Sequence, residues 1–331
     1  MPAIKAPVIR KLPLILLLGL AACAPRLQPA GPPVMAPRLT ADRFIATDGA
    51  ELPVKSWQPA GRARAVFLAL HGFNDYSNAF RIPAQFWAKR GIATYAFDQR
   101  GFGAAPHTGI WPGIEAMKSD LRAVAAALRA RHPEIPLFLL GDSMGGAVIM
   151  AAMADGGAPM ADGAILAAPA VWGRRHMNPF QRGALWLFAH TLPWVTLTGQ
   201  GLNIKPSDNI AMLKKLSADP KVIKRTRIDT IWGLVNLMDV AFAAAGSVRG
   251  PALVLYGRRD EVVPAEPSLQ MMRALPRKGI RTAIYDGAYH MLLRDLKADV
   301  ALGDIAAWIA DHGRALPSGA DTAAAEILRR K

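Results

Sequence analysis

The sequence contains a single cysteine among its 331 residues. A lone cysteine excludes both a disulfide framework and a cysteine-rich metal site. No apolar stretch reaches the roughly 18–20 residues that a membrane-spanning helix needs. Glycine and proline, at 29 and 26 residues, are too few for collagen-like or low-complexity material. Because 52% of the residues are apolar and only 20% are charged, the chain can bury the core of one large domain or two modest ones.

Acidic residues are scarce as well. The chain has 25 Asp and Glu against 40 Lys and Arg, which gives a formal net charge of +15. This balance favours an acidic partner. The sequence has neither zinc-finger spacing nor aromatic residues interleaved with basic ones, so we expect no nucleic acid among its partners. An anionic membrane surface is the partner that the charge favours.

The first residues have the pattern of a secretory signal peptide. Arg10 and Lys11 precede an apolar run at 12–20, and two alanines then lead to Cys23. A basic region, a short apolar region and small residues before a cleavage site are typical of such a peptide. We therefore expect residues 1–22 to be removed, which makes the lone cysteine the first residue of the mature chain and leaves it with a net charge of +12.

Residues 20–23 (LAAC) resemble a bacterial lipobox. The resemblance implies a thioether-linked diacylglycerol on Cys23 and acylation of its new amine. It also implies a protein anchored in the bacterial cell envelope, which we expect at the outer membrane facing the periplasm. The alternative is an ordinary signal peptide followed by a coincidental cysteine. Residues 23–40 carry five prolines, which predicts a semi-extended tether outside the core.

The rest of the chain alternates between strand-like and helical patterns. Continuous apolar runs, typical of buried parallel strands, occupy residues 65–70, 92–97, 137–140, 163–166, 252–256 and, more weakly, 281–285. Apolar residues recur at helical spacing in 115–131, 147–153 and 298–310. Two short runs around Asp48-Gly49 predict a hairpin ahead of them. The alternation predicts the α/β class, with a mostly parallel central sheet and helices on both faces.

One stretch, residues 171–245, interrupts this alternation. It has no clear strand, four of the eight tryptophans, and ten basic residues against four acidic ones. Because it lies between two strand candidates, we expect a helical cap inserted into a core formed by 41–170 and 246–312. Residues 313–331 are small and polar, which predicts a flexible tail.

Ser143 lies in a Gly-x-Ser-x-Gly motif between a strand pattern and a helix pattern. In that context the glycines allow a tight turn that lifts the hydroxyl above the sheet, where the helix N-terminus favours developing negative charge. Ser143 is therefore the candidate nucleophile. The backbone N–H groups of Phe73 and Met144 are the candidate oxyanion hole, because Gly72 lets the chain swing over the serine. We expect His71 to hold this loop rather than to transfer protons.

A nucleophilic serine needs a base, and the base needs an orienting acid. His290 follows the last strand pattern and is the candidate base. Asp260 follows the preceding strand at its carboxyl end, where the sites of open α/β sheets form, and is the candidate acid. Glu261 and Asp286 are rival acids. Asp286 lies only four residues before His290, so it is poorly placed to reach the far nitrogen of the ring.

With these residues the chain resembles the α/β-hydrolase superfamily, whose triad follows the same chain order of Ser, Asp and His. Within it, residues 42–312 are similar to the monoacylglycerol lipase and bacterial lysophospholipase branch. The similarity rests on residues 71–77, 98–103, 141–146, 257–260 with 263–264, and 287–293, and in the cap on 207–209 and 219–220. The resemblance implies an α/β-hydrolase fold with a helical cap. It also implies hydrolysis of a carboxylic ester that carries an apolar acyl chain, and the tryptophans of the cap suit the lining of a pocket for that chain.

The residues and the resemblance together predict a serine hydrolase of acylglycerols or lysophospholipids that uses an acyl-enzyme intermediate and no metal or organic cofactor. Ser143 attacks, His290 takes and returns the proton, and Asp260 orients the imidazole. Because the fold does not fix the substrate, a peptidase or an acyltransferase with the same triad is one alternative. A catalytically silent envelope protein that only binds is another.

Overall fold

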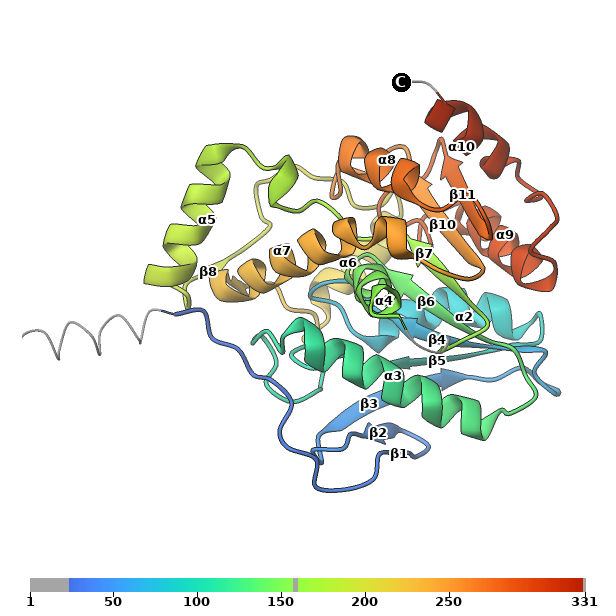
Figure 1. The fold of residues 1–331 in the computed structure, drawn as a ribbon, viewed down its shortest axis with the longest axis horizontal. Coiled ribbons are helices and arrows are strands. Elements are labelled where there is room, and N and C mark those ends of the chain that lie inside the picture. The colour runs from blue at the N-terminus through green and yellow to red at the C-terminus, as the bar shows by residue number, and fades with distance from the viewer. Residues whose placement is uncertain (1–23, 157–159, 330–331) are drawn as a thin grey trace, which may run out of the picture.

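The computed structural model describes residues 24–156 and 160–329, so the signal peptide and Cys23 of the sequence analysis lie outside it. Its centre is a nine-stranded sheet in the order β1-β2-β3-β5-β4-β6-β7-β10-β11 (Figure 1). The strands are β1 (Arg38–Leu39), β2 (Arg43–Ile45), β3 (Glu51–Trp57), β4 (Ala65–Leu70), β5 (Ile92–Phe97), β6 (Leu137–Asp142), β7 (Gly163–Ala167), β10 (Ala252–Gly257) and β11 (Ile280–Tyr285). From β5 to β11 the neighbours pair parallel, whereas β1, β2 and β3 are antiparallel. The expected mostly parallel sheet and the hairpin around Asp48-Gly49 are thereby confirmed.

Helices cover both faces of the sheet. One face carries α3 (Ile114–Arg131), α4 (Met144–Ala154) and α8 (Ala265–Ala274), and the other carries α2 (Arg81–Ala88) and α9 (Ala298–Ala310). Because side chains alternate along a strand, β4 supplies both cores. Val66 and Leu68 pack on the first face, and Phe67 packs on the second.

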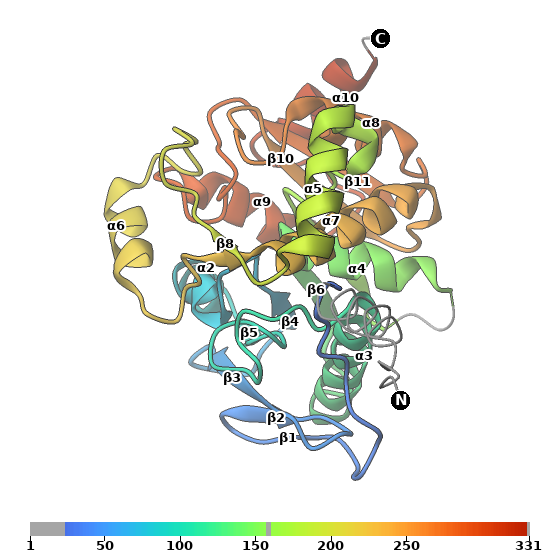
Figure 2. The same ribbon diagram turned by 90° about the vertical axis from the view of Figure 1, so that its left-hand side faces the viewer.

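Residues 171–245 form a cap beside the carboxyl edge of the parallel strands (Figure 2). The cap contains α5 (Pro179–Thr191), α6 (Ile210–Ala218) and α7 (Ile228–Ala243), and also two strands of two residues each, β8 (Thr196–Leu197) and β9 (Thr226–Arg227). Helix α7 packs on α4. A Cβ added at Gly233 of α7 would lie 2.3 Å from Cγ of the buried Trp111, so the missing side chain lets the cap settle on the core.

The proline-rich segment is extended, but it is not the free tether that its composition predicts. The backbone N–H of Arg26 donates to the Asp229 carboxylate at the start of α7 (3.2 Å). The N–H of Gln28 donates to the carbonyl of Trp111 (2.9 Å). Prolines hold residues 24–37 extended, and several of the remaining N–H groups find acceptors on the rest of the molecule. The segment therefore lies along the molecule and reaches the base of the cap.

The C-terminal residues are not the flexible tail that we expected. Residues 320–329 form helix α10 (Ala320–Arg329), which packs against β11. Ala324 is fully buried, and Asp321 forms an ion pair with Arg281 of β11. The segment has a helical stripe of small and aliphatic residues, and the sequence analysis missed this stripe because small alanines form its buried positions.

Candidate functional site

Ser143 occupies a strained turn between β6 and α4. Its backbone has φ 51° and ψ −110°, a conformation that residues other than glycine rarely adopt. The neighbouring glycines make the turn possible. A Cβ at Gly145 would lie 2.1 Å from the carbonyl oxygen of Leu70, and one at Gly141 would lie 2.4 Å from the backbone nitrogen of Gly146. The turn therefore requires glycine at both positions of the motif.

Asp260 and His290 meet at the carboxyl edge of the sheet, one after β10 and the other after β11. Asp260 Oδ2 accepts a hydrogen bond from His290 Nδ1 at 2.7 Å. Its other oxygen, Oδ1, accepts from the backbone N–H groups of Val262 (2.8 Å) and Val263 (2.9 Å). Both carboxylate oxygens are therefore fixed, and the imidazole is oriented with Nε2 free.

The two rival acids are engaged elsewhere. The Asp286 carboxylate accepts from the Arg258 guanidinium at 2.8 Å and is largely exposed. The Glu261 carboxylate accepts from the backbone N–H of Lys205 at 2.7 Å. Neither hydrogen-bonds to His290, so the structure pairs the histidine with Asp260.

The pKa of His290 reflects two opposing effects. Burial disfavours the charged imidazolium, but the Asp260 carboxylate outweighs burial, and the pKa of His290 is raised above its usual value. Asp142 adds to the upward shift because its carboxylate also lies near the ring. An imidazole in this setting can accept a proton and hold it as a stabilised cation.

The loop that precedes α2 lies over the serine. A Cβ at Gly72 would lie 3.4 Å from Ser143 Cβ, so the chain passes very close to the hydroxyl-bearing carbon. Among the described residues, neither the Phe73 N–H nor the Met144 N–H donates to a protein acceptor. Likewise, no hydrogen bond within 24–156 and 160–329 joins the Ser143 hydroxyl to His290. Such catalytic contacts often tighten only when substrate is bound.

His71 holds this loop in place. Its Nδ1 donates to the Gly72 carbonyl (2.8 Å), while its Nε2 accepts from the backbone N–H of Gln99 (3.0 Å). The Gln99 side chain returns a hydrogen bond to the His71 carbonyl (2.9 Å). Burial lowers the pKa of His71, so the ring is neutral and serves as a brace.

The sequence analysis missed a buried ionic cluster beneath the site. The Arg294 guanidinium lies 2.9 Å from the Asp75 carboxylate and 3.7 Å from that of Asp142, the residue before Ser143. All three side chains are buried. One signal was available: a carboxylate at the end of an apolar strand needs a buried cation as its partner.

The cap is linked to the loop that carries His290. The Ser207 hydroxyl donates to Asp295 Oδ1 (2.6 Å), and Asp295 Oδ2 accepts from the backbone N–H of Tyr289 (2.8 Å). The N–H of Met291 donates to the carbonyl of Pro206 (2.9 Å). The residues on both sides of the histidine are thereby fastened to the cap.

Two cap tryptophans do not have the surroundings expected of pocket lining. Trp186 and Trp194 are 55% and 51% exposed. Trp232, by contrast, is partly buried and lies against the Arg174 guanidinium and the His190 ring. The two exposed tryptophans therefore belong to the outer surface of the cap.

Comparison with known proteins gives this geometry a context. Residues 61–297 match the family model Hydrolase_4, described as serine aminopeptidase, S33. The chain is 22% identical to a monoacylglycerol lipase of Mycolicibacterium smegmatis, over 81% of this chain and 96% of that protein. It is 25% identical to the monoglyceride lipase of Rattus norvegicus, over 80% of this chain and 89% of that protein.

Among solved structures, a soluble variant of monoglyceride lipase from Saccharomyces cerevisiae in complex with a substrate analogue is similar to this chain. The TM-score is 0.70 at 20% identity, over 87% of this chain and 99% of that one. A likeness at this identity establishes the α/β-hydrolase fold. The chain therefore belongs to the α/β-hydrolase family described as serine aminopeptidase, S33, and resembles the monoacylglycerol lipases.

Proposed function

We propose that the protein is a serine hydrolase that cleaves the carboxylic ester of a monoacylglycerol or lysophospholipid. The hydrogen bond from His290 to Asp260 carries this proposal, because it orients a base beside a serine that the turn of the backbone presents above the sheet. The names of the relatives, which are monoacylglycerol and monoglyceride lipases, support an acylglycerol as the substrate.

The reaction follows from which atoms are already occupied. Since Asp260 takes Nδ1 of His290, the Nε2 atom is left to accept the Ser143 proton as the oxygen attacks the ester carbonyl. The unpaired N–H groups of Phe73 and Met144 are the donors for the resulting oxyanion. His290 then gives its proton to the leaving alcohol, and an acyl group stays on Ser143. A water molecule, activated by the same histidine, releases the fatty acid.

Labelling with a fluorophosphonate tests the role of Ser143. We expect the probe to label the wild type, and we expect Ser143→Ala to remove labelling and to lower ester hydrolysis by roughly four to six orders of magnitude. The thermal midpoint should hardly change, because the hydroxyl has no hydrogen-bond partner among the residues that the structure describes. Ser217→Ala, an exposed serine of α6, is the matched control. Turnover of the Ser143 variant within about tenfold of wild type contradicts the assignment.

A peptidase is the second candidate, since the description of the matching family names an aminopeptidase. The two candidates differ in the bond that they cleave. Two substrates with the same aromatic group on the leaving atom distinguish the candidates. One is an acyl ester and the other is an aminoacyl arylamide, and the hydrolysis rate of each is measured. Hydrolysis of the arylamide alone contradicts the lipase proposal.

We also propose that Cys23 carries lipid and holds the protein in the bacterial cell envelope, at the outer membrane facing the periplasm. The lipobox-like residues 20–23 support this proposal. Separately, no helix within the described residues is long and apolar enough to cross a membrane. The segment from residue 24 onward starts beside the cap, on the side where α5 and β8 lie, and runs from there along the core toward β1 (Figure 1).

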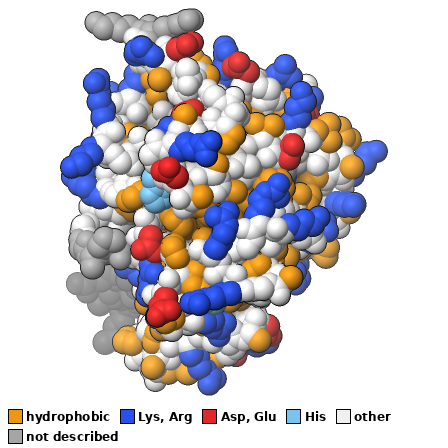
Figure 3. Space-filling model, turned by 90° about the vertical axis from the view of Figure 1, so that its right-hand side faces the viewer, with side chains coloured by type: hydrophobic (Ala, Val, Ile, Leu, Met, Phe, Trp, Pro, Cys, Tyr) orange, Lys and Arg blue, Asp and Glu red, His pale blue; other side chains and the backbone are white. Residues whose placement is uncertain are grey.

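The cap is the surface that we propose to contact the membrane. Its outer side exposes large apolar side chains, which are Phe180, Trp186, Leu187, Phe188, Leu192, Trp194, Val195, Leu197, Leu202, Ile204 and Ile210. Exposed apolar surface on this scale marks an interaction site. Positive charge alone does not single out the cap, because Lys and Arg side chains are also spread over the opposite face (Figure 3). The combination of apolar and basic residues distinguishes it.

A further inference from the structure

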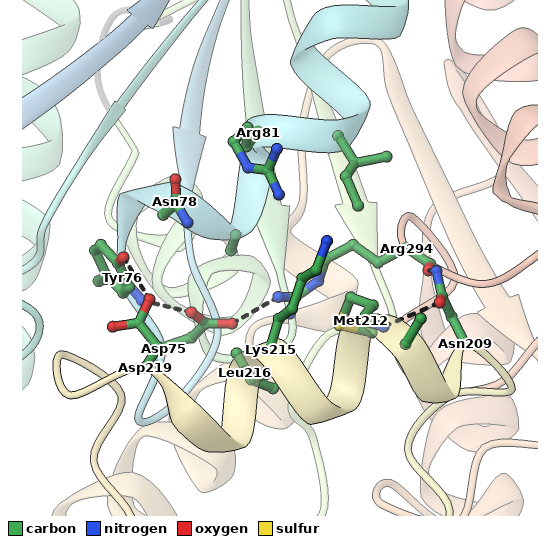
Figure 4. A pocket seen from close by; sticks show the side chains of 13 residues that line it. Asp75, Tyr76, Asn78, Arg81, Asn209, Met212, Lys215, Leu216, Asp219 and Arg294 are labelled. Atoms are coloured by element: carbon green, nitrogen blue, oxygen red, sulfur yellow. Dashed lines mark hydrogen bonds and ion pairs between the residues drawn. The ribbon is translucent and has the colours of Figure 1, made fainter.

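A cavity of about 230 Å³ lies between the core and the cap, apart from Ser143 and His290. Arg81 and Asn78 line it from the core, near the start of α2, and Lys215 lines it from α6 of the cap. Figure 4 shows the Arg81 and Lys215 side chains entering this space from opposite walls, with Asn78 to one side. The lining also includes the carboxylates of Asp75 and Asp219 and the guanidinium of Arg294.

Three cations line this cavity, and two of them, Arg81 and Lys215, have no counter-ion among the described residues. Within the part of the chain that the structure describes, neither Arg81 nor Lys215 forms an ion pair or a side-chain hydrogen bond. Of the two acids in the lining, Asp75 is paired with Arg294 at 2.9 Å, whereas Asp219 accepts from the Tyr76 hydroxyl at 2.7 Å and keeps its negative charge. Both side chains are exposed, and an anion between them would be attracted by both.

The cavity lies close to the reaction. Arg294 forms part of its lining, and the same guanidinium reaches Asp142, the residue next to Ser143. Asp75, also in the lining, follows Gly72 in the loop that passes over Ser143. One layer of side chains therefore separates the cavity from the candidate nucleophile.

We propose that this cavity binds a phosphate ester. The guanidinium of Arg81 supplies a planar pair of donors, Lys215 supplies a point charge, and the Asn78 amide supplies a further donor, a set that suits the several oxygens of phosphate. The phosphate comes either from the headgroup of the substrate or from a phosphate that is not part of it. In the first case the inference rests on the proposed function, and the site favours lysophospholipids over neutral monoacylglycerols. Because Arg81 and Lys215 lie on different sides of the cavity, the anion also links the cap to the core.

A comparison of two substrates tests the first source. The full chain, purified in a neutral detergent, is assayed with octanoylglycerol and with octanoylglycerol 3-phosphate, and the ratio of their kcat/KM values is recorded. We expect Arg81→Gln and Lys215→Gln each to lower the ratio of phosphorylated to neutral substrate by about tenfold, because each removes one charge-assisted contact. Lys89→Gln removes a cation just beyond the end of α2, outside the cavity, and should leave the ratio unchanged.

Inorganic phosphate is the probe for the second source. We expect phosphate to raise the thermal midpoint of the wild type, and of Lys89→Gln, more than that of the Arg81→Gln/Lys215→Gln double variant. A midpoint shift with an unchanged substrate ratio assigns the site to a phosphate outside the substrate. The inference is overturned if the substrate ratio is unchanged in the variants and phosphate shifts the thermal midpoint of every protein equally. Absence of hydrolysis of either substrate by the wild type contradicts the proposed function instead, so the two failures are distinguishable.

Discussion

At the scale of single residues, the hydrogen bond between Asp260 and His290 sets the pH at which the proposed base works. The base must be neutral to accept a proton, and Asp260 favours the charged imidazolium. At a given pH, a raised pKa therefore leaves less of the histidine in its active form. The benefit comes later in the reaction, because the same carboxylate stabilises the cation that forms when Ser143 is deprotonated.

We expect kcat/KM for a soluble ester to fall on the acid side with a midpoint above about pH 6.5, the ordinary value for histidine. In Asp260→Asn the midpoint should move to lower pH, since the negative charge is gone, and kcat should fall by roughly four orders of magnitude. Asp286→Asn is the matched control, because that carboxylate pairs with Arg258 and not with the ring. An acid limb that stays in place in Asp260→Asn contradicts this account of the histidine.

The sequence allowed part of this chemistry to be predicted. Ser143 could be predicted because its motif has a strand before it and a helix after it. Its two partners, Asp260 and His290, could be predicted because they follow later strands. The role of Arg294 could not be predicted, because it depends on two carboxylates that lie far away along the chain and approach Arg294 only in the folded protein. Asp142, at the end of an apolar strand, indicated that some buried cation was needed, but no local pattern identified Arg294 as that cation.

At the scale of helices and strands, close backbone contacts decide how the cap sits on the core. Helix α7 crosses Trp111 at Gly233, where any side chain would enter the indole ring. Helix α5 also contains a glycine, Gly183, but a Cβ there would meet nothing within 4 Å. A glycine is therefore required by packing in α7, whereas the glycine of α5 has room for a side chain.

This contrast predicts opposite effects of one substitution. Gly233→Ala should lower the free energy of unfolding by about 1–3 kcal/mol, because the methyl group overpacks the joint between the cap and the core. Gly183→Ala should raise it by about 0.5–1 kcal/mol, because alanine is the better helix former at an open site. Denaturant unfolding of both variants beside the wild type measures the difference. Equal midpoints for the two variants contradict the packing described at Trp111.

Strands were easier to predict than the terminal segments. Residues 65–70 and 92–97 have continuous apolar runs, and the strands cover the same residues. Helix α10 gave a weaker signal, since its buried positions are alanines and its main anchor is the ion pair of Asp321 with Arg281. An element that is stabilised by contacts with distant residues cannot be recognised from its own composition.

At the scale of the whole molecule, the lone cysteine should decide where the protein resides. We expect Cys23→Ser to abolish incorporation of radiolabelled palmitate and to move the protein from the membrane fraction to the soluble fraction. The host must be a bacterium that processes lipoproteins. Ser217→Ala, expressed beside it, controls for handling. A Cys23→Ser protein that still takes up label and pellets with membranes contradicts lipid attachment at this residue.

The cap should give the protein an affinity for lipid that does not depend on acylation. A chain of residues 24–331 should bind vesicles that contain phosphatidylglycerol better than vesicles of phosphatidylcholine alone, because each basic residue near an anionic surface contributes up to about 1 kcal/mol. Binding should weaken as salt rises from about 50 to about 500 mM, since salt screens these charges.

Charge reversal locates this effect on the surface. Replacing Lys214, Lys215, Lys224 and Arg225 by Glu should remove the preference for anionic vesicles. The control variant carries Glu in place of four exposed cations at the opposite edge of the sheet, which are Lys89, Arg90, Arg277 and Lys278. This control should keep the preference for anionic vesicles. Equal binding of the wild type to both kinds of vesicle at low salt contradicts a membrane role for the basic residues of the cap.

The docked N-terminal segment limits the distance between the membrane and the folded core of an enzyme anchored through Cys23. A free chain of residues 23–40 would extend up to about 60 Å, at roughly 3.3–3.6 Å per residue. Because the backbone of Arg26 is already bound to Asp229, only the residues before it can act as a spacer, and they span roughly 10 Å. A protein anchored in this way lies directly against the leaflet that holds its lipid. It can draw substrate only from the lipids beneath it and cannot reach across to a second membrane.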